Sequence, residues 1–158
     1  MANGVKVGDK APDFSLVDAE NITRNLKEFL GQKVVLVFFV GAFTSTCTKE
    51  MCEFRDSMSR LVDLDAQVIG VSVTDPFSSK AFAERNRLPF PILSDYKREV
   101  IKTYELEFPD FAGLNGYTVA KRSIFILDKQ GIVRYVWISE DPSVEPNYKE
   151  IQDTLEKI

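Results

Sequence analysis

The sequence predicts an α/β fold in which a mixed central sheet is flanked by helices and preceded by a β-hairpin. Short apolar runs rich in β-branched and aromatic residues alternate with helical patterns, which favours parallel strands joined by crossover helices. A turn at 128–131 joins two late strands, so antiparallel pairing is expected as well. The 158 residues match the usual size of one domain, and we expect residues 1–158 to form a single domain.

The first third of the chain predicts a hairpin, a helical turn and a buried strand. Phe14–Val17 and Ile22–Leu26 flank a polar turn and predict the hairpin. One helical turn is expected at Leu26–Leu30, ending at Gly31. Val34–Val40 shows no polar alternation, which is typical of a strand buried on both faces at the centre of a sheet.

Beyond that strand, helical and extended patterns alternate to the end of the chain. Ser45–Leu64 predicts a helix with one apolar stripe, made of Cys47, Met51, Phe54, Met58 and Leu61. The other expected elements are strands at 68–73, 92–93, 124–127 and 132–138 and helices at 78–87, 98–106 and 148–158. Residues 108–119 contain turn-forming residues and predict a long irregular loop. The thioredoxin fold has this order of elements.

Composition excludes several classes of function. Twenty Lys and Arg against 24 Asp and Glu give a formal charge of −4, which argues against nucleic-acid and anionic-membrane binding. The chain has no histidine, which excludes a Ser-His-Asp triad and histidine-ligated zinc or haem. Two cysteines are too few for a thiolate zinc site or an iron–sulfur cluster within one chain. We expect no metal and no cofactor, with chemistry carried by carboxylates, hydroxyls, Lys or Arg, or the thiols.

The sequence predicts a soluble, cytoplasmic protein. Met1–Lys10 has no apolar segment of the kind found in secretory signals. The longest apolar stretch, Val34–Phe43, is about half as long as a membrane-spanning helix. Two cysteines five residues apart do not make the disulfide framework of a small secreted domain, so in a reducing compartment they are expected to be reactive or buried.

One cysteine is expected at the start of a helix. After the break at Gly41, Thr44, Ser45 and Thr46 are three residues of the type that caps helix N-termini. Cys47 then lies in the first helical turn, where free amides and the helix dipole stabilise an anion such as a thiolate. Position alone leaves two interpretations open: Cys47 is a reactive nucleophile, or it is the first buried residue of the apolar stripe.

Cys52 lies five residues further along the same predicted helix. It is about 140° around the helix from Cys47, away from the apolar stripe. Positions five apart in a helix have Cα atoms about 8 Å apart, beyond the roughly 7 Å limit for a disulfide. A bond between Cys47 and Cys52 would therefore require the first helical turn to unwind.

Three segments together resemble the peroxiredoxin family. Thr44-x-x-Cys47 is similar to the family's active-site motif, Pro-x-x-x-Thr/Ser-x-x-Cys. The opening Val7–Phe14 is typical of these proteins, and Arg122–Asp128 resembles their later strand, which carries an active-site arginine. The three matches occur in the family's order and span most of the chain.

The resemblance implies a thioredoxin-fold peroxidase that reduces hydrogen peroxide and alkyl hydroperoxides. Cys47 would be the peroxidatic nucleophile that becomes a sulfenic acid, Thr44 would orient the peroxide, and Arg122 would stabilise the thiolate. Glu50 matches the family's acidic residue three positions after the cysteine, a neighbour that holds an arginine. Val40 replaces the family's proline, which packs over the cysteine; valine restores an N–H and frees φ, so a looser pocket is expected.

The same resemblance assigns Cys52 as the resolving cysteine of an atypical two-cysteine, peroxiredoxin Q-like arrangement, Cys-x4-Cys. An intramolecular disulfide would form and would be reduced by thioredoxin or a glutaredoxin-like protein. One alternative is a one-cysteine peroxidase with an external thiol and an inert Cys52. Another is a thioredoxin-fold disulfide-exchange or binding protein without peroxidase activity, which the absence of Cys-x-x-Cys disfavours.

Aromatic residues are numerous on the predicted loops. The set consists of Phe43, Phe77, Phe82, Tyr96, Phe108, Phe111 and Tyr117. Two interpretations stay open, because such residues either pack in the ordinary way or form a homodimer surface near the active site. The family resemblance implies the homodimer, since many short peroxiredoxins build a dimer interface from these loops.

Overall fold

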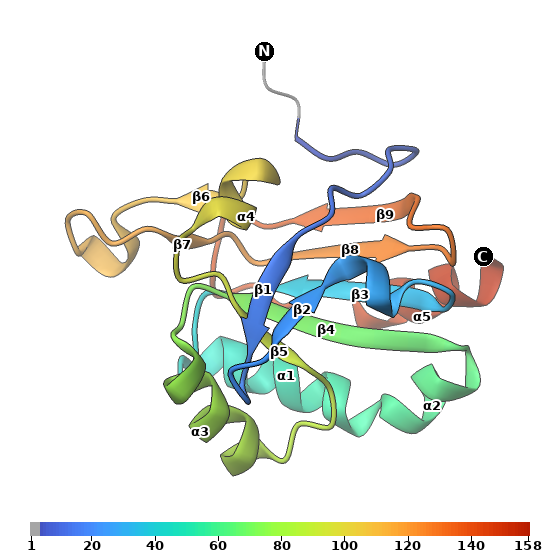
Figure 1. The fold of residues 1–158 in the computed structure, drawn as a ribbon, viewed down its shortest axis with the longest axis horizontal. Helices are drawn as coiled ribbons and strands as arrows, with labels where there is room; N and C mark the ends of the chain where they lie inside the picture. Colours follow the sequence, from blue (N-terminus) through green and yellow to red (C-terminus); the bar gives the residue numbers. More distant parts are fainter. Residues whose placement is uncertain (1–3) are drawn as a thin grey trace.

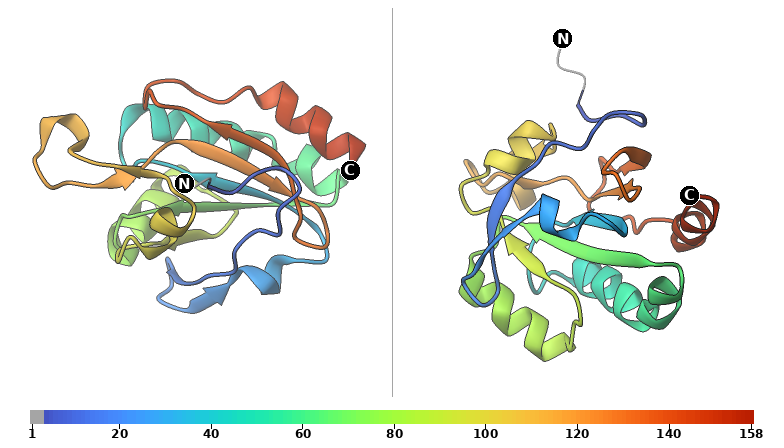
Figure 2. Two further views of the ribbon diagram at one scale, coloured as in Figure 1. Left: turned by 90° about the horizontal axis from the view of Figure 1, so that it is seen from above. Right: turned by 45° about the vertical axis from the view of Figure 1, so that its right-hand side comes forward.

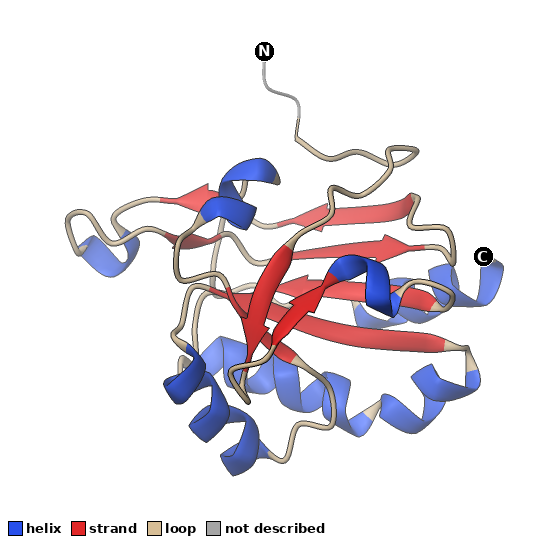
Figure 3. Ribbon diagram, viewed as in Figure 1, coloured by secondary structure: helices blue, strands red, loops and turns tan. Residues whose placement is uncertain are grey.

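The computed structural model describes residues 4–158, which form a seven-stranded mixed sheet and its covering helices (Figure 1, Figure 3). Across the sheet, the strands lie in the order β2 (Thr23–Asn25), β1 (Ser15–Asp18), β5 (Ile92–Ser94), β4 (Ala66–Ser72), β3 (Lys33–Phe38), β8 (Ser123–Leu127) and β9 (Val133–Ile138). Strand β4 is parallel to β3 and β5, whereas β8 is antiparallel to β3 and β9. The parallel crossovers, the opening hairpin β1–β2 and the closing antiparallel pair are all as predicted.

Helices cover the two faces of this sheet. The helices α1 (Ser45–Asp56), α2 (Met58–Asp63) and α5 (Tyr148–Lys157) lie along one face, and α4 (Glu99–Thr103) lies on the other (Figure 2). The helix α3 (Pro76–Asn86) packs against β5, and a 3₁₀ turn (Leu26–Phe29) follows β2 as expected. None of the helices in residues 4–158 has the length and apolar character needed to cross a membrane.

The long helix expected over Ser45–Leu64 is divided into α1 and α2 at Ser57. Ser57 has φ −95° and ψ 0°, outside the helical region. Its N–H donates to the carbonyl oxygens of both Glu53 and Phe54, which closes α1 before α2 begins. Serine has a lower helix propensity than alanine or leucine, which favours a break at this position, while the buried Leu61 keeps α2 on the apolar stripe.

The prediction of one irregular loop over 108–119 is wrong at both ends. Short strands β6 (Glu107–Phe108) and β7 (Val119–Ala120) pair there in antiparallel register. Between them, a 3₁₀ turn (Phe111–Gly113) brings the Phe111 ring against those of Phe108 and Tyr117, with centroids 5.9 and 6.2 Å apart. Packing among these rings gives the connection an order that its turn-forming residues did not indicate.

Strand β3 is the centre of the core, as its apolar run predicts. Its last residue, Phe38, and the following Phe39 point to opposite faces because side chains alternate along extended chain. The Phe38 ring lies 5.2 Å from Tyr104 and 5.8 Å from Phe125. Phe39 stacks on Phe82 of α3 at 6.0 Å. The aromatic pair thus anchors the end of β3 from both sides.

The register between β3 and β8 decides where the site forms. Phe38, the last residue of β3, is paired with Ser123, the first residue of β8. Because the two strands are antiparallel, the chain leaving β3 toward α1 lies beside the chain entering β8. Side chains from the start of α1 and from the residue before β8 can therefore meet at this edge of the sheet.

Gly70 in β4 leaves room for side chains of the neighbouring strand β5 and of helix α1 to pack over it. A Cβ at this position would lie 2.8 Å from Cδ1 of Ile92 and 3.3 Å from Cε1 of Phe39. The sulfur of Met51, on the buried stripe of α1, would be 3.7 Å away. Any side chain at position 70 would therefore crowd the side chains that pack α1 against the sheet.

We expect Gly70→Ala to lower the free energy of unfolding by about 1–2 kcal/mol through overpacking. Ile92→Val removes the closest atom, Cδ1, and should cost about 1 kcal/mol by itself. Urea unfolding of both single variants and the double variant measures the coupling between them. The double variant should lose less stability than the sum of the two; strictly additive losses would contradict this account of Gly70.

Candidate active site

The connection between β3 and α1 ends in the first turn that carries Cys47. Thr44 is the N-cap residue, with an extended backbone, and Phe43 before it adopts a left-handed φ of 67°. The expected side-chain cap does not form: no N–H of the first turn donates to the Thr44 hydroxyl, which itself donates to the carbonyl oxygen of Gly41 at 3.0 Å. Within the described residues, no side chain caps the amides of the first turn, so these amides can interact with an anion.

Cys47 is fully buried and contacts a cation. Its sulfur lies 3.1 Å from Nη2 of Arg122, which is only 1% exposed. Arg122 immediately precedes β8, so the antiparallel register with β3 explains why residues 75 positions apart meet here. The structure therefore brings together the cysteine and the arginine that the sequence singled out.

Glu50 lies one helical turn after Cys47 and binds the same guanidinium. Its Oε1 accepts a hydrogen bond from Arg122 Nη1 at 2.7 Å, and both side chains are buried. The other carboxyl oxygen, Oε2, has no hydrogen-bond partner among the described residues. Arg122 also donates from Nε and Nη2 to the carbonyl oxygen of Pro142, at 3.1 and 2.8 Å. The guanidinium is thus held by a sulfur, a carboxylate and a backbone carbonyl.

Burial changes the acidity of this cluster. Removal from water raises the pKa of Glu50 to about 7, although the charge of Arg122 opposes the shift. Burial alone would lower the pKa of Arg122, but the charges of Glu50 and Cys47 outweigh it and the pKa rises. The guanidinium is therefore always charged, and Glu50 and Cys47 both interact with that charge.

Cys52 faces a different neighbour. Its half-buried thiol donates to Oδ1 of Asn86 at the end of α3, with sulfur and oxygen 3.6 Å apart. Arg55 contacts the same residue, donating to the carbonyl oxygen of Asn86 at 2.8 Å. Helix α1 is continuous and both cysteines are free thiols. A Cys47–Cys52 disulfide thus requires the rearrangement that the spacing predicted.

A surface hollow opens beside the cysteine loop. Val40, Phe43 and Thr44 line it from the β3–α1 connection, and its volume is about 390 Å³. Val40 itself is buried, with 2% of its surface exposed. Arg98 and Tyr117 also line the hollow. The sequence did not indicate that Arg98 lines this hollow. It also did not indicate that the Pro142 carbonyl oxygen binds Arg122, because a backbone acceptor has no signature in the sequence.

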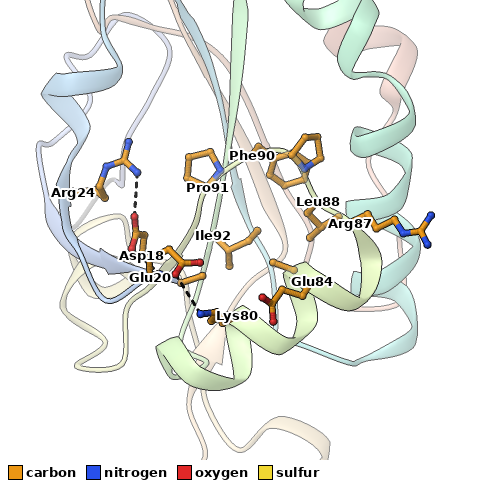
Figure 4. A pocket seen from close by; sticks show the side chains of 13 residues that line it. Asp18, Glu20, Arg24, Lys80, Glu84, Arg87, Leu88, Phe90, Pro91 and Ile92 are labelled. Carbon is orange, nitrogen blue, oxygen red and sulfur yellow. Dashed lines mark hydrogen bonds and ion pairs between the residues drawn. The ribbon is translucent and has the colours of Figure 1, made fainter.

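A second hollow, of about 450 Å³, lies between the hairpin β1–β2 and α3 (Figure 4). Its charged rim includes the ion pairs Asp18–Arg24, at 3.1 Å, and Glu20–Lys80, at 3.3 Å. None of the residues predicted for the site lines this hollow. Within residues 4–158, no three His, Cys, Asp or Glu side chains gather in a group that could hold a metal ion.

A buried thiol at a helix start, paired with an arginine on the neighbouring strand, is the arrangement that the sequence resemblance predicts. Residues 7–136 match the profile of the AhpC/TSA family. The chain belongs to the AhpC/TSA family of peroxiredoxins. The family match covers the β3–α1 connection and the start of β8, so it includes Cys47, Glu50 and Arg122.

Individual relatives agree with this assignment. The chain is 38% identical to the chloroplastic peroxiredoxin Q of Triticum aestivum over 154 residues, covering 98% of this chain and 67% of the relative. It is 36% identical to that of Populus jackii, covering 96% and 67%. It spans about two thirds of the length of these curated relatives.

Solved structures give the same result for the fold. The peroxidoxin BcpB of Mycobacterium tuberculosis superposes with a TM-score of 0.85 at 32% identity, covering 98% of both chains. The thioredoxin-like fold predicted from the sequence is thereby confirmed, as is the assignment to the peroxiredoxins. The chain is a thiol-dependent peroxidase of this family.

The raised pKa of Glu50 predicts a pH dependence of stability. Its pKa is about 7 in the native state against 4.5 ordinarily, so the native state binds more protons between these values. The contribution of Glu50 to stability is therefore complete below the ordinary pKa and is lost as the pH rises through about 7.

Glu50→Gln is neutral at every pH and should lack this dependence. Between about pH 5 and about pH 8, the wild type should lose on the order of 2 kcal/mol more unfolding free energy than the variant. Urea unfolding at both pH values measures the difference. Equal losses in the two proteins would show that Glu50 titrates as an ordinary carboxyl.

Proposed function

We propose that Cys47 is the peroxidatic cysteine and that Arg122 stabilises its thiolate. The 3.1 Å contact between Arg122 Nη2 and the Cys47 sulfur is the observation that carries this proposal. The chain has no histidine to take the thiol proton, so a fixed cation and the uncapped start of α1 do the work of stabilising the anion.

The proposed reaction begins with attack of the thiolate on a hydroperoxide, either hydrogen peroxide or an alkyl hydroperoxide. A bond forms between the Cys47 sulfur and one peroxide oxygen, and the O–O bond breaks. The other oxygen takes up a proton and leaves as water or an alcohol, while the cysteine is oxidised to a sulfenic acid. Thr44 orients the peroxide, since it lines the hollow beside the cysteine loop.

In the second half of the cycle, Cys52 acts as the resolving cysteine. Its thiolate attacks the sulfenic sulfur; the S–S bond forms, the S–O bond breaks, and the departing hydroxyl takes up a proton and leaves as water. Because Cys52 faces Asn86 and α1 is continuous, the first turn of α1 must open before the two sulfurs meet. Thioredoxin or a glutaredoxin-like protein then reduces the disulfide by thiol–disulfide exchange. The alternative is a one-cysteine cycle in which an external thiol reduces the sulfenic acid directly.

The proposal also includes a homodimer and a cytoplasmic location. Of the aromatic residues singled out in the sequence, Phe82 is buried, whereas Phe43, Phe77, Tyr96 and Tyr117 are exposed. Aromatic residues are enriched at protein–protein interfaces, which supports a dimer through these loops. Sedimentation of the reduced protein tests the dimer, and fractionation of expressing cells tests the location.

Cys47→Ser is expected to abolish peroxide consumption, because a serine hydroxyl is not ionised near neutral pH and attacks peroxide poorly. The measurement is loss of hydrogen peroxide over time, together with the mass of the protein after peroxide addition. The wild type should gain one oxygen or lose two hydrogens, and the variant should do neither. Consumption at the wild-type rate by the variant would refute the assignment of Cys47.

Cys52→Ser separates the two proposed cycles. Oxidation of Cys47 in the first turnover should stay within about twofold of wild type, since Cys52 does not contact the reacting sulfur. Turnover with thioredoxin as reductant should fall at least about tenfold, because no disulfide forms. Turnover with a small thiol such as dithiothreitol is the control and should persist. Unimpaired cycling with thioredoxin would favour the one-cysteine alternative.

A further inference from the structure

The connection between β9 and α5, residues 139–147, returns to the active site and binds Arg122 at two places. The backbone N–H of Ser139 donates to the carbonyl oxygen of Arg122 at 2.9 Å. Three residues later, the carbonyl oxygen of Pro142 accepts hydrogen bonds from both Nε and Nη2 of the guanidinium. This segment therefore fixes the main chain of Arg122 and the end of its side chain together.

Asp141 holds this connection in a tight turn. Its Oδ1 accepts hydrogen bonds from the backbone N–H of Ser143 at 2.9 Å and from the Ser143 hydroxyl at 2.7 Å. The Ser139 hydroxyl donates to the carbonyl oxygen of Asp141 at 2.7 Å and accepts from its N–H at 3.1 Å. The bonds from Ser143 lower the pKa of Asp141, so its carboxylate is ionised at neutral pH. Pro142 lies between the two ends of this network.

The far end of the connection is attached to α1. The Tyr148 hydroxyl donates to Oε1 of Glu145 at 2.7 Å, and the Tyr148 ring packs edge-on against Phe54 of α1 at 5.5 Å. Lys49, also on α1, lies 3.9 Å from Oε2 of Glu145. The connection is thus anchored on both sides of Pro142, which limits how far its carbonyl oxygen can move.

We propose that Asp141 is a positioning residue for the reaction: its turn fixes the Pro142 carbonyl, which keeps the Arg122 guanidinium on the Cys47 sulfur. The inference rests on the roles proposed for Cys47 and Arg122. Asp141 is exposed, and its side chain bonds Ser143 rather than the thiol or Glu50. It acts only through the backbone, and the guanidinium loses an acceptor for two of its N–H groups when the turn loosens.

The test compares Asp141→Ala with Asp141→Asn, which keeps a side-chain oxygen for Ser143. Thiolate formation by Cys47 is followed through its ultraviolet absorbance and its rate of alkylation, and peroxide oxidation is followed separately. In Asp141→Ala the midpoint of thiolate formation should rise by about half a unit or more. The rate of peroxide oxidation near neutral pH should fall about threefold to tenfold. Asp141→Asn should restore most of the wild-type midpoint and most of the wild-type rate of peroxide oxidation.

The direction in which the midpoint of thiolate formation shifts distinguishes a positioning role of Asp141 from a purely electrostatic one. Removing a negative charge favours a nearby anion, so a purely electrostatic effect of Asp141→Ala would lower the midpoint. Asp153→Ala, which removes a partly exposed carboxylate from α5, is the matched control and should behave as wild type. A wild-type or lowered midpoint in Asp141→Ala, or equal losses in Asp141→Asn, would overturn the proposal. Alkylation reports on the thiolate without peroxide, so wild-type protein that alkylates but does not oxidise at Cys47 would refute the proposed function instead.

Discussion

The buried guanidinium of Arg122 is the interaction on which the site depends. A cation with 1% exposure is unfavourable unless its charge and its N–H groups are matched. Here the Cys47 sulfur, one oxygen of Glu50 and the Pro142 carbonyl supply the match. Removing one partner leaves the guanidinium incompletely matched, so the thiol, the carboxylate and the β9–α5 connection are energetically linked through one side chain.

In the function proposed for Cys47, this arrangement takes the place of the imidazole that many thiol enzymes use. The cation is permanent, so it would stabilise the proposed thiolate without a base that must itself titrate. Glu50 competes for the same cation, and its pKa of about 7 means that much of the protein carries a neutral Glu50 near neutral pH. A neutral Glu50 leaves the charge of Arg122 to the sulfur.

The sequence predicts the framework of this site better than its details. The apolar run of β3, the helix that follows and the closing strands all follow from periodicity, and the motif around Cys47 and Arg122 identifies the candidate reacting groups. The break at Ser57 depends on hydrogen bonds between backbone groups, which side-chain periodicity does not encode. The Thr44 hydroxyl caps the helix only if its side chain directs the oxygen at the amides of the first turn, and the folded connection places the hydroxyl against the carbonyl oxygen of Gly41 instead. The Pro142 carbonyl was not predictable because it is a backbone atom brought to Arg122 by tertiary packing.

In the proposed mechanism, Arg122 makes Cys47 a thiolate. The most direct measurement is the pH dependence of thiolate absorbance in Arg122→Gln, with the double variant Arg122→Gln and Glu50→Gln as a control for the carboxylate left unpaired. We predict that the midpoint of thiolate formation rises by about one unit or more in both variants and that peroxide oxidation slows in parallel. A midpoint equal to that of the wild type in the folded double variant would contradict it.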